Sequence, residues 1–183
     1  MQRPRPVLRC AWFTLAVACG SNTGAGSGDA GMPHADPSGA TGMSASQEQD
    51  LARVRASTKS FRSLETAGAA GYERVVQRCI AHVHHGAMGY HHTNAGLLDD
   101  VLEVERPEIL VYERTSDGSY VLNGVEYIVP YAARPRDAEP PVIMGQELKR
   151  ADGLSLWYLH VWIWSGNARG LFDDWNPEVE CRP

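Results

Sequence analysis

The residues with the greatest capacity for chemistry lie in one short segment, residues 79–94, which reads CIAHVHHGAMGYHHTN. Five of the seven histidines of the chain are found there: His82, His84, His85, His91 and His92. Imidazole binds transition metals and transfers protons near neutral pH, so the segment predicts a metal site or another polar site. Side chains of adjacent residues in a strand point to opposite faces, so only one histidine of the 91–92 pair can enter a shared site.

Three apolar segments further along the chain each carry one ionisable residue. Glu113 follows Leu-Val-Tyr, Glu126 lies within GVEYIVP, and His160 lies within LHVWIW. Each of them alone could be the end of a strand, a solvated position or a core histidine. Charges within apolar strands are costly unless they are paired or ligated, however, and three such cases favour a common site. Together with His91 we expect them to bind a divalent transition metal, with zinc, copper, iron or manganese as candidates.

The most apolar segment, LSLWYLHVWIW, predicts a strand with two different faces. Trp157, Leu159, Val161 and Ile163 form a plain core face. The opposite face carries aromatic side chains around the histidine: Tyr158, Trp162 and Trp164 beside His160. An aromatic face of this kind also predicts a binding site for a small ligand or sugar, without chemistry.

The sequence also predicts a helix before these strands, which would pack on one face of the sheet. Ser46 and Gln49 have the spacing of a capping box, and apolar residues then recur at helical spacing towards Ala70, with Gly71 as the C-cap. A second, short helix is expected from Gly96, closed before Pro107. Asp117-Gly118 predicts a hairpin, and Gly124 a β-bulge in the strand after it. We therefore predict an α+β fold, with an N-terminal amphipathic helix packed on a mostly antiparallel sheet.

The N-terminal region has the features of a secretion signal. Residues 1–18 combine three arginines with a short apolar run, which predicts a lipoprotein signal peptide. The sequence LAVAC then makes Cys19 the expected acylated residue, although ordinary secretion with an unmodified Cys19 is the alternative. Residues 19–46 are rich in Gly, Ser and Ala and predict a flexible linker. Residues 47–183 form the expected single globular domain.

The cysteines and the charge narrow the functional classes. With Cys10 in the signal and Cys19 acylated, Cys79 and Cys181 remain, and in an oxidising compartment we expect a disulfide closing a loop of 102 residues. The alternative is that both thiols join the histidines as metal ligands. Without the three arginines of residues 1–18, Lys plus Arg falls from 17 to 14 against 22 acidic residues, a formal charge of -8. This charge and the lack of a basic stripe exclude nucleic acid as the expected partner.

The ordered motifs GxMGxHxxN, PExLxYE, GVEY and LHVWxW, followed by NPxxxC, occur here between residues 86 and 181. With them the chain resembles an uncharacterised family of small exported bacterial proteins, several of them lipoproteins. The resemblance gives His91 and Asn94 the conserved-motif positions of the first element, and it supports the Cys79–Cys181 pair. The resemblance implies no activity. We expect Asn94 to be a ligand-binding residue together with Tyr158 and Trp162.

Three functions remain open at this point. The first is a membrane-tethered extracytoplasmic domain that binds a transition metal through His91, Glu113, Glu126 and His160. The second is a small-ligand-binding module with an aromatic face, and the third is a structural envelope lipoprotein. Glu126 and His91 could also serve as an acid–base pair without a metal. Gly20 after Cys19, in place of the Asp typical of inner-membrane retention, favours an outer-membrane location.

Overall fold

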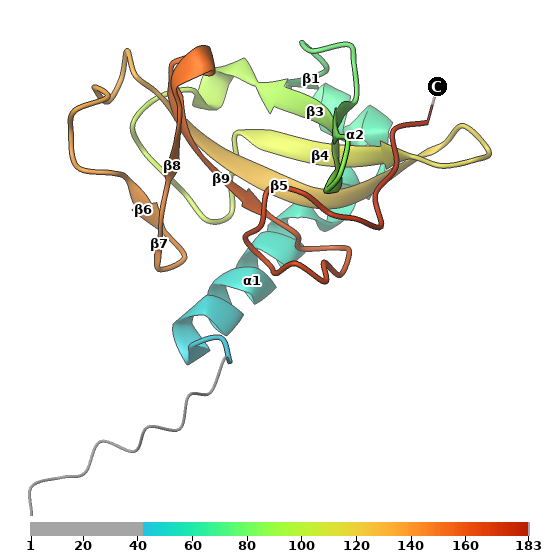
Figure 1. Ribbon diagram of the computed structural model, residues 1–183, viewed down its shortest axis with the longest axis horizontal. Coiled ribbons are helices and arrows are strands. Elements are labelled where there is room, and N and C mark those ends of the chain that lie inside the picture. The colour runs from blue at the N-terminus through green and yellow to red at the C-terminus, as the bar shows by residue number, and fades with distance from the viewer. Residues whose placement is uncertain (1–41, 183) are drawn as a thin grey trace, which may run out of the picture. The chain divides into compact units, whose positions relative to one another are not determined.

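The computed structural model of the chain describes residues 42–182, and the expected signal peptide, Cys19 and most of the expected linker lie outside this range. Within it the fold is α+β, with a seven-stranded antiparallel sheet (Figure 1). The path of the sheet runs β1-β3-β4-β5-β9-β8, and β2 pairs separately with β3. The strands of this sheet are β1 Tyr72–Glu73, β2 Ile80–His82, β3 Gly86–Asn94, β4 Ile109–Arg114, β5 Tyr120–Pro130, β8 Lys149–Ala151 and β9 Leu156–Val161. A separate two-stranded ribbon joins β6 Val142–Ile143 to β7 Gln146–Glu147.

The N-terminal helical region begins two residues earlier than predicted. Ser44 is the N-cap of α1 (Ala45–Thr58): its side chain accepts from the Gln47 amide, while the Gln47 side chain accepts from the Ser44 amide. This is the predicted Ser-x-x-Gln capping box in an earlier register, because the sequence contains the pattern twice. Ala45 and Ser46 consequently belong to the helix and not to the linker. None of the helices in residues 42–182 is long and apolar enough to cross a membrane.

The prediction of one continuous helix up to Ala70 is wrong. After α1 the chain tightens into a 3-10 turn, Lys59–Arg62, and then starts a second helix, α2 (Leu64–Ala69). Ser63 separates them, because its side chain accepts from the Thr66 amide and so caps a new helix. Gly71 has a positive φ of 94° and ends the region as expected.

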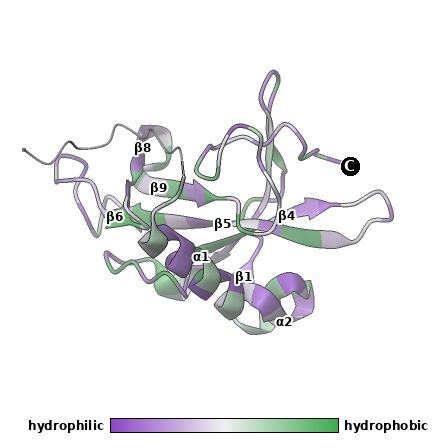
Figure 2. Cartoon of the chain, turned by 90° about the horizontal axis from the view of Figure 1, so that it is seen from below, coloured by the Kyte–Doolittle hydropathy of each residue, from purple (hydrophilic) through white to green (hydrophobic). Residues whose placement is uncertain are grey.

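The main core lies on one face of the sheet, where side chains of β5 and β9 meet those of α1. Trp157, Leu159 and Val161 are buried there together with Val125 and Tyr127, as the alternation in the sequence predicted. Leu51 and Val54 of α1 belong to the same cluster. Figure 2 shows hydrophobic residues along the central strands. The other face of the sheet carries a smaller cluster of Ile109, Val111 and Ile128, with Leu156 and Tyr158 packed against it.

The short helix expected from Gly96 is reduced to a 3-10 turn, Ala95–Leu97. The aspartates that follow compete with helical hydrogen bonding, since Asp99 Oδ1 accepts from the Val101 amide at 2.8 Å. The chain then reaches β4 without further helix, while Leu102 and Val104 pack against the main core. The apolar residues of this segment are thus used for packing, not for a helix face.

The hairpin and the bulge between β4 and β5 agree with the sequence. Gly118 has a φ of 85° and donates its amide to Thr115, while Asp117 accepts from the Ser119 amide. Val111 pairs with Gly124 but Tyr112 pairs with Leu122, so Asn123 is the extra residue of the bulge. A side chain at Gly124 would place its Cβ 2.7 Å from the carbonyl oxygen of Val161. Gly124 therefore allows β9 to approach β5 closely.

The C-terminal segment contacts the β2–β3 region through a disulfide and through a backbone bridge. Cys79 and Cys181 form a disulfide with their Cα atoms 5.5 Å apart, as expected from the cysteine count. Ala87 and Asn176 exchange two backbone hydrogen bonds of 3.1 and 3.0 Å. Both contacts hold the segment against the β2–β3 hairpin.

Candidate functional site

A pocket of about 530 Å³ lies over the sheet face opposite to the main core, and we call it the sheet pocket. Its walls are mostly apolar because they come from the smaller cluster on this face of the strands. Val75, Val76 and Leu154, three large apolar residues at its edge, are strongly exposed. The lining residues are Val75, Val76, Arg78, Ile80, Met88, His91, Thr93, Ile109, Glu126, Ile128, Ala151, Leu154, Leu156 and Tyr158.

Two ionisable residues of the sheet pocket face each other across a strand. His91 of β3 pairs with Val111, and Glu126 of β5 pairs with Ile109, so β4 runs between them. Nε2 of His91 lies 3.5 Å from Oε2 of Glu126, and the two residues are only 9% and 8% exposed. This separation is longer than an ordinary N–H···O hydrogen bond. The two side chains are therefore close enough to contact one bound group, but they form no hydrogen bond of ordinary length with each other.

Burial changes the protonation of both members of this pair. It raises the pKa of Glu126 to about 8, and the carboxylates of Asp174 and Glu108 add to the shift while Lys149 opposes it. Burial also lowers the pKa of His91 to about 4, against a contact with the Gly89 backbone that raises it. Both pKa shifts favour the uncharged forms, which are a protonated carboxyl for Glu126 and a neutral ring for His91.

His160 lies beside this pair and is fully buried. It is directly opposite Glu126 in the β5–β9 ladder, and its ring centroid lies 6.2 Å from that of His91 and 4.5 Å from that of Trp162. Neither ring nitrogen has a hydrogen-bond partner within residues 42–182. Burial lowers the pKa of His160 well below its usual value, so the ring is neutral.

The structure brings together three of the four residues expected to bind a metal. Glu113 is four residues along β4 from Ile109, the partner of Glu126, which corresponds to roughly 13 Å of strand. Its carboxylate instead accepts from Asn123 Nδ2 and from the Glu180 amide. Within residues 42–182 no group of three or more His, Cys, Asp or Glu side chains is placed to hold a metal ion. The expected four-residue arrangement is thus corrected: Glu113 holds the C-terminal segment.

Of the expected ligand-binding residues, only Tyr158 lines the sheet pocket. Its hydroxyl donates to Asp174 at 3.0 Å. Trp162 is buried beside Ala87 and Val179, and its Nε1 donates to the backbone of Asp173. Asn94 is used structurally instead, because its side chain accepts from the Gly96 amide and donates to the carbonyl of Ala70.

The remaining histidines of the opening segment fall into two groups. His92 is buried on the other face of β3, with its ring 4.9 Å from that of Tyr112, so of the 91–92 pair only His91 enters the sheet pocket. His82, His84 and His85 lie at the β2–β3 turn, where the rings of His82 and His85 stack at 4.3 Å. None of these four lines the sheet pocket.

Sequence reasoning missed a further buried carboxyl, Glu108. It is almost fully buried, accepts from the Ile128 amide at 3.1 Å, and has its pKa raised to about 8, chiefly by burial. Its position was a usable signal for a buried carboxyl, because Glu108 follows Pro107 and directly precedes the apolar strand β4. The segment around Val75 and Val76, in contrast, has no pattern that predicts a pocket wall.

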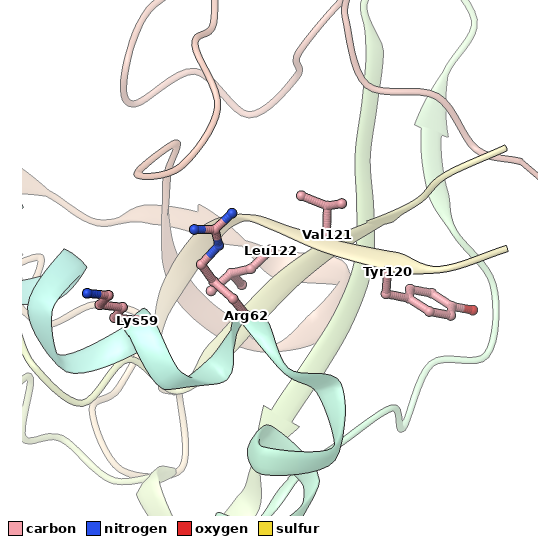
Figure 3. Close-up of a pocket in the computed structure, with 5 residues that line it drawn as sticks. All are labelled: Lys59, Arg62, Tyr120, Val121 and Leu122. Carbon is pink, nitrogen blue, oxygen red and sulfur yellow. The ribbon is translucent and has the colours of Figure 1, made fainter. Parts of the chain in front are cut away.

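A second hollow, of about 430 Å³, lies elsewhere and is shown in Figure 3. Lys59 and Arg62 come to it from the helical region, while Tyr120, Val121 and Leu122 come from β5. None of these five is a histidine or a carboxylic acid, and the hollow is open to solvent. The sheet pocket is therefore the better candidate site.

No protein-family model, curated protein or solved structure matches this chain. The candidate site is an apolar cavity over the sheet with a buried carboxyl–imidazole pair in its wall. Beside the pair lies a histidine that has no hydrogen-bond partner within residues 42–182.

Proposed function

We propose that this chain is a binding module for a small, mostly apolar molecule, which it holds in the sheet pocket. The single observation that carries the proposal is a cavity of about 530 Å³ with apolar walls and one convergent polar pair, His91 and Glu126. Ligand sites in proteins usually measure about 300–1,000 Å³ and combine apolar walls with a few placed polar groups. The exposed apolar residues Val75, Val76 and Leu154 at the edge support the same function, because a bound molecule would cover them.

The proposal is tested by titrating the purified full chain with N-phenyl-1-naphthylamine, an uncharged dye that fluoresces in apolar surroundings. Ala151→Trp fills the pocket from β8 and should raise the dissociation constant at least about tenfold. Val142→Trp is the matched control, since Val142 is exposed and lies outside the pocket lining. No binding by the wild type, or equal binding by the Ala151 variant, would contradict the proposal.

A second candidate function is transition-metal binding by His91, Glu126 and His160, for which the buried, unpartnered nitrogens of His160 are the supporting observation. Unsatisfied buried nitrogens are costly, and ligation is one way to satisfy them. The side chains would have to turn towards a common point for this. Calorimetric titration with zinc, copper, iron or manganese tests it: binding should vanish in His160→Leu and persist in His84→Leu.

We propose further that the domain is exported and anchored to the cell envelope, in the outer membrane, by lipid on Cys19. The support is the signal-like sequence of residues 1–18 and the Cys79–Cys181 disulfide, which suits an oxidising compartment. Cys19→Ser should move the protein from the membrane fraction to the soluble fraction, while Cys10→Ser should not. A wild-type protein that is already soluble would rule out the anchor.

A further inference from the structure

We infer that the ligand of the sheet pocket is an uncharged molecule whose hydroxyl group bridges Glu126 and His91. This inference rests on the proposed function and specifies its ligand class. It starts from the distance of 3.5 Å between Nε2 of His91 and Oε2 of Glu126. An oxygen atom placed beside both can form two normal hydrogen bonds where the pair itself forms none of ordinary length.

The hydrogen-bonding capacity of the two groups decides what kind of oxygen fits. Oε2 of Glu126 and Nε2 of His91 belong to nearly buried residues, and each atom can donate or accept according to where its proton lies. A hydroxyl is both donor and acceptor, so it satisfies both groups at once, whereas an ether or ketone only accepts and satisfies at most one of them.

The surroundings of the pair select against a charged ligand head group at this position. The neighbouring walls are Ile109, Ile128 and Tyr158. Among the charges that act on Glu126, the carboxylate of Asp174 has the largest effect, and Lys149, which is paired with Asp174, opposes it. A carboxylate placed here would lose its hydration against the apolar walls and would be repelled by Asp174. The remainder of the ligand must be apolar to match the walls.

The experiment compares four probes of nearly one shape: 2-naphthol, 2-methoxynaphthalene, naphthalene and 2-naphthoate. Their dissociation constants are measured by calorimetry with the full chain at pH 7. We expect 2-naphthol to bind about tenfold more tightly than naphthalene and 2-methoxynaphthalene, as one to two extra hydrogen bonds predict. We expect 2-naphthoate to bind most weakly.

Variants of the pair then assign the preference to it. Glu126→Gln keeps an uncharged donor and should retain the preference for 2-naphthol, whereas Glu126→Leu and His91→Phe should lose it while still binding naphthalene. Glu147→Leu, at an exposed carboxylate of β7, is the control and should behave as wild type. Equal binding of all four probes, or tightest binding of 2-naphthoate, overturns the inference and leaves the pocket function standing. Binding of none overturns the proposed function together with the inference.

Discussion

Glu126 and His160 lie directly opposite each other in the β5–β9 ladder, yet in the described part of the chain the His160 ring has no hydrogen bond to Glu126 or to any other group. Cross-strand neighbours of this kind usually interact, because their Cβ atoms are about 5 Å apart. Here each side chain turns to a different place: Glu126 towards His91 and the sheet pocket, and His160 towards Trp162. The β5–β9 ladder thus places two buried polar side chains opposite each other without a hydrogen bond between them.

The unpartnered ring of His160 leads to a stability prediction. His160→Leu removes two buried nitrogens without partners and replaces them with an apolar side chain of similar size. A buried unsatisfied polar group costs about 1–3 kcal/mol, so the free energy of unfolding in urea should stay equal or increase by up to that amount. A marked loss of stability in the metal-free variant would show that the imidazole makes an interaction in solution that stabilises the fold.

The raised pKa of Glu126 predicts a pH-dependent difference between the wild type and Glu126→Gln. The folded carboxyl binds its proton up to about pH 8, whereas in the unfolded chain it ionises near pH 4.5. Glu126 therefore contributes a loss of stability to the wild type as the pH rises from 4.5 to 8, and this contribution is absent from the uncharged Gln variant. The difference in free energy of unfolding should shift in favour of Glu126→Gln by up to about 5 kcal/mol over this range, at about 1.4 kcal/mol per pKa unit. Urea unfolding at pH 5, 7 and 9 measures it; Glu108 and His91 titrate in both proteins. A constant difference across the three pH values would mean that Glu126 is ionised in the fold.

The Cys79–Cys181 disulfide should stabilise the edge of the sheet pocket, so this edge should become more mobile when the disulfide is absent. Arg78 and Ile80, on either side of Cys79, both line the sheet pocket. Cys79→Ser with Cys181→Ser should lower the free energy of unfolding by about 2–5 kcal/mol, because the 102-residue loop is no longer closed in the unfolded chain. Hydrogen exchange should also speed up in residues 75–80 more than in β5. Unchanged exchange at the edge would show that packing alone holds it.

Two glycines allow a matched test of backbone geometry in β3 and α2. Gly89 has a φ of 117°, and a Cβ there would lie 2.5 Å from the carbonyl oxygen of Tyr112. Gly68 lies in α2 with open space around it. Gly89→Ala should therefore destabilise by at least about 2 kcal/mol, whereas Gly68→Ala should stabilise by up to about 1 kcal/mol. Similar values for the two in urea unfolding would contradict the positive φ in solution.

Sequence patterns predicted the strands well, because alternation is a local property of the chain. The burial of Trp157, Leu159 and Val161 on one face, with Tyr158 on the other, follows from residue spacing alone. The hairpin at Asp117-Gly118 follows from local turn chemistry in the same way. Helix bounds were predicted less well, since a repeated capping pattern and the cap at Ser63 both offered alternative starts.

The candidate site was predicted only in part, because its formation depends on register and on distant segments. His91 and Glu126 come together across β4 only in the observed pairing, and Glu113 is carried away from them by its position along the same strand. The edge of the pocket comes from residues 75–80, whose position is fixed by a disulfide to residue 181. No spacing rule within a single strand contains that information.

The 102 residues between Cys79 and Cys181 also impose an order on assembly. A chain that has been synthesised only as far as β5 already contains Glu126, His91 and both edge residues next to Cys79, but it lacks the partner that fixes this edge. Leu156 and Tyr158 of β9, and Leu154 in the turn before this strand, are likewise made late. If the sheet pocket binds a small molecule as proposed, binding would therefore follow completion and oxidation of the whole domain.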